Sequence, residues 1–192
     1  MTDMRKLSGI LLTFALLISC TGQNSNSGEP MDQAHSRDVD VYDRLSEQGI
    51  ELTEPGAPTA SFVLAVRSGD LVFLSGHGPD LPEGGQITGK LGTDDITLEE
   101  GQEAARLTGI SLLSSLEQEI GDLNKVVKIV KVTGMVNAHP SFTQHSQVIN
   151  GFSDLMVEVF GESGAHSRAS IGMSSLPGNI AVEIDMVVEV RD

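Results

Sequence analysis

The sequence has few of the residues that build several common kinds of functional site. Its one cysteine, Cys20, leaves no partner for an intrachain disulfide and none for a cysteine-rich metal site. It has no tryptophan and one tyrosine, and its 12 Lys and Arg against 27 Asp and Glu give a formal net charge of −15. Such a charge repels phosphate backbones, so general nucleic-acid binding is disfavoured. No apolar run is long enough to predict a spanning helix in the mature protein.

The first twenty residues have the pattern of a secretory signal peptide. Arg5 and Lys6 precede a mostly apolar stretch, residues 7–18, which is too short to span a bilayer. The sequence LISC that ends at Cys20 resembles a bacterial lipobox, which implies removal of residues 1–19 and lipidation of the cysteine. The alternative is an ordinary N-terminal helix with a buried cysteine.

The residues that follow the cleavage point predict an anchor and a spacer. Residues 20–38 would be the lipidated Cys20 and a flexible tether, because this stretch is rich in Gly, Ser and Asn and cannot bury a core. The protein would then be a periplasm-facing lipoprotein of the cell envelope. Thr21 stands where an aspartate would suggest inner-membrane retention, which favours the outer membrane by resemblance to enterobacterial sorting. Residues 39–192 would form one domain.

The spacing of apolar residues predicts an α+β domain. Spacings of three predict a short helix over 39–48, and alternation predicts a β-hairpin within residues 62–74. Thr97 and Glu100 form a capping box that begins a long helix to about Ile120. Further expectations are a candidate short strand over 86–91, a strand over 126–132, a helix over 141–160, and strands over 168–173 and 180–190.

This order of elements predicts one sheet with two helices on one of its faces. The last strand would turn Ile180, Val182, Ile184, Met186 and Val188 to the helices. The opposite face would carry Ala181 and Val187 beside acidic residues, and a half-apolar face of this kind is a candidate for subunit contact.

Few residues suggest chemistry by themselves. The five histidines (His35, His77, His139, His145 and His166) lack the spacing of metal ligands, so no metal site is expected. Arg168 begins a strand in a stretch with few other cations, and its planar guanidinium suits a carboxylate ligand. The alternative for Arg168 is an ion pair with a strand acid such as Glu183.

Two segments resemble a known family. Residues 168–185 (RASIGMSSLPGNIAVEID) are similar to the C-terminal signature of the Rid family, which is an arginine, a strand, Leu-Pro and a strand carrying a glutamate. Rid proteins are reactive-intermediate (imine/enamine) deaminases, also filed under YjgF and L-PSP endoribonuclease. Residues 62–79 resemble the family's N-terminal hairpin, which ends in Ser-Gly-Xaa-Xaa-Pro. Residues 89–92 and 104–106 look like one less-studied branch.

The resemblance implies a chorismate-mutase-like fold, assembled as a homotrimer with a cleft between each pair of subunits. Arg168 would bind the substrate carboxylate, with help from the backbone N–H of Gly76. Glu183 would position and activate the attacking water. Ser75 would belong to the same substrate-binding loop.

Three further substrate-binding residues are implied where this chain departs from better-known members. Phe62 matches a common tyrosine and loses its hydroxyl. Ser170 falls where others have a cysteine whose backbone contacts the water. Asn150 falls near a family asparagine, although the segment before it is about four residues longer here.

The function implied is hydrolytic deamination of reactive 2-imino or enamine acids to 2-keto acids and ammonia, which needs no cofactor and no metal. The alternative is a non-catalytic envelope trimer that binds small carboxylates or a protein partner. Endoribonuclease activity, the third hypothesis, is disfavoured by the acidic charge and the few aromatics. The membrane would be contacted through the lipid anchor alone, and no nucleic acid would be bound.

Overall fold

The computed structural model describes residues 40–58 and 60–192. The predictions for the signal peptide, Cys20 and the tether lie outside these residues. No helix in the described part of the chain is long and apolar enough to cross a membrane. The described helices and strands are α1 (Val41–Glu47), β1 (Ala65–Ser68), β2 (Leu71–His77), α2 (Leu98–Ile120), β3 (Val126–Asn137), α3 (His145–Phe160), β4 (Ser167–Met173) and β5 (Val182–Val190).

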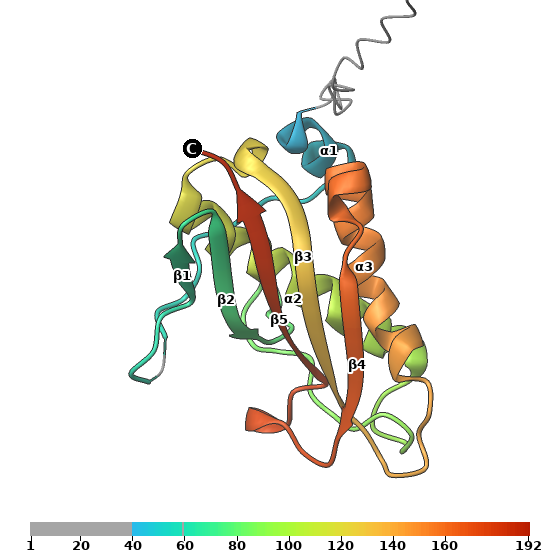
Figure 1. The fold of residues 1–192 in the computed structure, drawn as a ribbon. Coiled ribbons are helices and arrows are strands. Elements are labelled where there is room, and N and C mark those ends of the chain that lie inside the picture. Colours follow the sequence, from blue (N-terminus) through green and yellow to red (C-terminus); the bar gives the residue numbers. More distant parts are fainter. Residues whose placement is uncertain (1–39, 59) are drawn as a thin grey trace, which may run out of the picture. The chain divides into compact units, whose positions relative to one another are not determined.

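The five strands form one sheet in the order β1-β2-β5-β3-β4 (Figure 1). β3 and β4 run parallel, and the other neighbouring strands are antiparallel. Both long helices, α2 and α3, cover the same face of the sheet, which is called the helix face below. The opposite face of the sheet is called the open face. The predicted single sheet with two helices on one face is confirmed.

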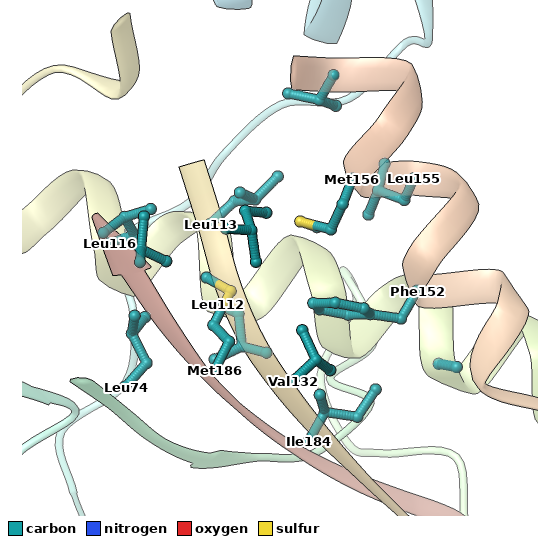
Figure 2. Close-up of a cluster of buried hydrophobic side chains, with 14 of the residues drawn as sticks. Leu74, Leu112, Leu113, Leu116, Val132, Phe152, Leu155, Met156, Ile184 and Met186 are labelled. Atoms are coloured by element: carbon teal, nitrogen blue, oxygen red, sulfur yellow. The ribbon is translucent and has the colours of Figure 1, made fainter. Parts of the chain in front are cut away.

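The core lies between the helix face and the two long helices (Figure 2). β5 sends alternate residues into it, because successive side chains of a strand point to opposite faces. Phe152 of α3 and Leu112 of α2 are fully buried against this layer. The β5 residues in this core are Val182, Ile184, Met186 and Val188, all buried.

The predicted capping box begins α2. The backbone N–H of Glu100 donates to Thr97 Oγ1 at 3.2 Å, and the backbone N–H of Thr97 donates to Glu100 Oε2 at 2.7 Å. The two contacts satisfy backbone donors that the first helical turn leaves unpaired. Gly121 ends the helix with φ of 76°, a left-handed conformation that glycine adopts without strain.

Some predicted boundaries are wrong. Residues 86–91 make only isolated bridges, because Gly89 turns the chain with φ of 128°. β1 begins at Ala65, three residues after Phe62. Ala181, expected beside the acids on the face away from the helices, is fully buried where its backbone bonds to Ile87 and Asn137.

Candidate functional site

The two principal predicted site residues lie on opposite faces of the sheet. Glu183 alternates with buried Val182 and Ile184 along β5, so its side chain lies on the open face. Arg168 is paired with Val132, which is buried on the helix face, and paired residues share a face. The chain therefore presents Arg168 and Glu183 to different surroundings.

The Glu183 carboxylate lies directly over Gly76 of β2. A Cβ added at residue 76 would lie 3.0 Å from Glu183 Cδ and closer still to Oε1. A glycine at this position therefore makes room for the carboxylate. Partial burial raises the pKa of Glu183 above its ordinary 4.5, and the negative charge of Asp185, two residues along the open face, raises it further. A raised pKa brings a carboxyl group closer to the pH at which it can both take up and release a proton.

The Arg168 guanidinium is held by uncharged acceptors on α3. Nη1 donates to Asn150 Oδ1 at 3.1 Å and to Ser153 Oγ at 2.8 Å, and Nη2 donates to the Ser146 carbonyl at 3.2 Å. Arginine has five N–H donors, so one on Nη2 and the one on Nε have no partner among the described residues. Two donors and a full positive charge remain for a carboxylate ligand.

The alternative of an ion pair between Arg168 and Glu183 is wrong. The side-chain ion pairs within residues 40–58 and 60–192 are Arg67 with Asp192 and Arg106 with Glu158. The two site residues cannot pair within one subunit because they lie on opposite faces of the sheet.

A histidine lies behind the arginine. His166 Nε2 is 2.9 Å from Ser153 Oγ, and His166 Nδ1 is 2.6 Å from the Gly164 carbonyl. Burial lowers the pKa of His166 below 6.5; the Gly164 carbonyl opposes this shift, and the nearby Arg168 charge adds to it. Burial and the Arg168 charge therefore favour the neutral form of His166.

The remaining predicted site residues are distributed between the two faces. Asn150, on α3, is exposed and its side-chain oxygen accepts from Arg168. Ser170 points to the helix face, and its Oγ is buried without a hydrogen-bond partner in the described part of the chain. Ser75 Oγ donates to the Val63 carbonyl at 2.7 Å, and Phe62, before β1, is 44% exposed. Their roles toward a substrate remain predictions.

A cavity of about 530 Å³ lies elsewhere, between residues 49–57, the loop 80–85 and α2. Buried His77 reaches it, but Nδ1 is 2.7 Å from the Ser75 carbonyl and Nε2 is 2.7 Å from Ser115 Oγ. Burial lowers the pKa of His77, which favours the neutral ring, and both nitrogens are engaged within the protein. His77 therefore joins β2 to α2 and offers the cavity no free nitrogen.

A family model described as "YjgF/chorismate_mutase-like, putative endoribonuclease" matches residues 42–190. The chain belongs to the YjgF family. Its single mixed sheet with helices on one face is the chorismate-mutase-like fold of this family, as the resemblance predicted.

Three YjgF relatives cover nearly all of the described domain. Protein TCP17 of Trypanosoma cruzi is 42% identical over 153 residues, which are 79% of this chain and 95% of that protein. The crystal structure of protein Atu1372 from Agrobacterium tumefaciens is 37% identical, covers 81% of this chain and 96% of its own, and has a TM-score of 0.73. A "putative endoribonuclease" from Shewanella oneidensis is 31% identical, covers 79% of this chain and all of its own, and has a TM-score of 0.76.

Ser146 and Ser153, which hold Arg168 together with the predicted Asn150, and His166 behind them were not predicted from the sequence. Ser146, Asn150 and Ser153 recur at spacings of four and three, which places them on one face of α3. This polar stripe on an amphipathic helix was the sequence signal that could have identified these residues. His166 gave none, because a lone histidine two residues before a strand arginine has no characteristic pattern. Among the described residues, no group of three or more His, Cys, Asp or Glu is placed to hold a metal.

Proposed function

We propose that this YjgF protein is a member of the Rid group that hydrolyses reactive 2-imino or enamine acids to 2-keto acids and ammonia. The observation that carries the proposal is that Arg168 and Glu183 do not neutralise each other. The arginine keeps its charge and two donors for an anionic ligand, and the glutamate keeps a carboxylate of raised pKa for proton transfer.

The chemistry needs two functions from the protein. Arg168 would bind the carboxylate of the imino acid and so fix C2, which is already electrophilic. Glu183 would accept a proton from water as the oxygen attacks C2, and would return that proton to the nitrogen. The resulting carbinolamine would lose the proton of its hydroxyl group to the nitrogen as the C=O bond forms and the C–N bond breaks, so that one imine and one water give one 2-keto acid and one ammonia.

The proposed site lies between two subunits of a homotrimer. Because Arg168 and Glu183 occupy opposite faces of one sheet, a cleft that contains both needs the arginine of one subunit and the glutamate of the next. The open face supports such an assembly, since Val66, Phe73 and Ile171 on that face are between 43% and 52% exposed. A closed ring of subunits would cover these side chains.

A competition assay tests the proposal. Imino acids generated in situ by an amino-acid oxidase are trapped by semicarbazide, and a deaminase lowers the yield of semicarbazone. We expect residues 21–192 to lower it and the Arg168→Ala variant to lose this effect while its oligomeric state is unchanged. Unchanged turnover in Arg168→Ala would refute the assigned site.

The second candidate is a binding trimer without turnover. It is favoured by Ser75, whose hydroxyl is engaged with the Val63 carbonyl, and by Phe62, which lacks a hydroxyl. Saturable binding of pyruvate, weakened in Arg168→Ala, with no turnover of small, aliphatic or aromatic imines would establish it. The proposed cell-envelope location is tested separately, by metabolic labelling of Cys20 with a fatty acid.

A further inference from the structure

A directed row of hydrogen bonds lies behind the Arg168 guanidinium. The Gly164 carbonyl can only accept, so the His166 Nδ1 that lies 2.6 Å from it carries the proton. Nε2 of the neutral ring is then an acceptor, and the Ser153 hydroxyl at 2.9 Å donates to it. Ser153 Oγ keeps its lone pairs for the N–H of Arg168 Nη1 at 2.8 Å. The donor and the acceptor of each hydrogen bond in the row are therefore fixed.

The far end of this row is fixed by packing. A Cβ at Gly164 would lie 2.9 Å from Val157 N and closer still to the Met156 carbonyl, so the Gly164 backbone lies directly on the last turns of α3. The His166 ring also packs edge-on against the buried ring of Phe152, with centroids 5.8 Å apart. The imidazole therefore has little freedom to turn.

We propose that Ser153 and His166 are positioning residues that orient Arg168 for its carboxylate ligand, an inference that rests on the proposed function. With Nη1 committed to α3, the guanidinium plane is fixed and its free donors on Nη2 and Nε point in one set direction. A preoriented arginine loses less entropy when it binds a carboxylate, and so binds it more tightly.

Protonation of His166 would disturb this arrangement. A proton on Nε2 removes the acceptor that Ser153 uses and places a second positive charge beside Arg168. That arginine is the charged group facing the ring from β4. α3 contributes the uncharged Ser153 and Phe152, and Gly164 contributes its carbonyl. Carboxylate affinity is therefore expected to fall as the pH drops through the pKa of His166, which lies below 6.5.

Two pairs of variants distinguish the effect of the Ser153 hydroxyl and of the His166 acceptor from the effect of side-chain packing. Ser153→Ala removes the hydroxyl and Ser153→Thr keeps it. His166→Phe removes the acceptor and His166→Gln keeps one near the position of Nε2. Ser46→Ala, on an exposed face of α1 with no side-chain hydrogen bond among the described residues, is the matched control.

The first measurement is rotation of the Arg168 guanidinium, followed by nitrogen NMR of its Nη groups, which reports positioning without any activity. We expect faster rotation and about tenfold weaker pyruvate binding in Ser153→Ala and His166→Phe, because an arginine that is free to turn loses more entropy when it binds a carboxylate. KM for imine turnover should rise more than kcat falls. Ser153→Thr and His166→Gln should restore slow rotation, and His166→Gln should lose the acid fall in affinity.

The outcomes distinguish this inference from the proposed function. Unchanged rotation and pyruvate affinity in Ser153→Ala would overturn the positioning role even if the wild-type protein turns over imines. Faster rotation and weaker pyruvate binding, without any imine turnover in the wild-type protein, would support positioning and refute the deaminase. If Ser153→Ala and His166→Phe changed the melting temperature but not the rotation of the Arg168 guanidinium, both residues would be structural and the inference would be overturned.

Discussion

The carboxylate of Glu183 on β5 occupies the space where a side chain of residue 76 on β2 would begin. Glu183 Cγ and Cδ would lie 3.1 and 3.0 Å from a Cβ at Gly76, distances that real Cβ atoms rarely show. β2 and β5 are neighbours, with a register irregularity between Leu74 and His77 that includes Gly76. The position of the carboxylate therefore depends on the absence of one methyl group on the adjacent strand.

We predict that Gly76→Ala displaces the Glu183 carboxylate and lowers kcat/KM for imine hydrolysis on the order of 100-fold, because an ångström-scale misplacement of a catalytic group has this cost. Steady-state kinetics in the competition assay measures the effect. Gly56→Ala is the control, since a Cβ there meets nothing within 4 Å. Equal activity of the two alanine variants would contradict the role of the close approach.

The acid limb of a plot of kcat against pH, in which the substrate is already bound, reports Glu183. As a general base the carboxyl group must be ionised, so activity should rise with pH through a midpoint above 4.5. Asp185→Asn removes a negative neighbour, lowers the pKa of Glu183 and should move this limb to lower pH. Asp94→Asn, in an exposed loop, should leave the limb in place. A limb that does not move in Asp185→Asn would show that another group is titrating.

The free energy of unfolding should also depend on the ionisation of Glu183. Because the pKa of Glu183 is raised in the folded state, its contribution to the free energy of unfolding is present at low pH and is lost as the pH rises through the raised pKa. Wild type should therefore gain stability relative to Glu183→Gln as the pH falls. Urea unfolding of both proteins at several pH values measures the difference, and parallel curves would contradict burial as the cause of the shift.

Complementation between inactive variants tests the two-subunit site. Arg168→Ala and Glu183→Gln protein, unfolded and refolded as an equal mixture, should regain about one quarter of wild-type activity. In randomly mixed cyclic trimers about one cleft in four joins an intact arginine to an intact glutamate. Each variant refolded alone should stay inactive. Verified mixed trimers without any recovery would place both residues of the site in one subunit.

The contact between α2 and α3 depends on Gly151. Alanine in a helix is normally about 1 kcal/mol more stable than glycine. Here a Cβ would lie 2.8 Å from the Gln102 carbonyl carbon and 3.2 Å from its Cα, which are backbone atoms that cannot move aside. We predict that Gly151→Ala instead destabilises the protein by about 1–3 kcal/mol, as overpacking does. Chemical denaturation measures it, and a gain in stability would contradict the close helix contact.

Much of the fold could be predicted because local signals and packing agree. The capping box at Thr97, the glycine stop at Gly121 and the alternation along β5 each depend on a few neighbouring residues, and the structure has all three. The candidate strand over 86–91 was wrong because Gly89 turns the chain with φ of 128°, so that these residues make only isolated bridges. The burial of Ala181 was not predicted, because Ile87, which bonds to its backbone, is distant in sequence.

The candidate site was predictable in its residues and less so in its arrangement. The resemblance marked Arg168, Gly76 and Glu183, and the structure places Gly76 under Glu183. The position of Arg168 on the opposite sheet face follows from strand pairing, which single-residue patterns do not report. The support from Ser153 and His166 depends on how α3 packs beside β4, a tertiary contact beyond the reach of periodicity.

The alternation of apolar and acidic residues along β5 also favours the correct strand register during folding. A slip of one residue against β3 would turn Glu183 and Asp185 into the apolar core and expose Val182, Ile184 and Met186. Burying two unpaired carboxylates costs free energy, so a sheet with this shifted register is unstable. The acids of the open face therefore select the correct strand pairing before any ligand is present.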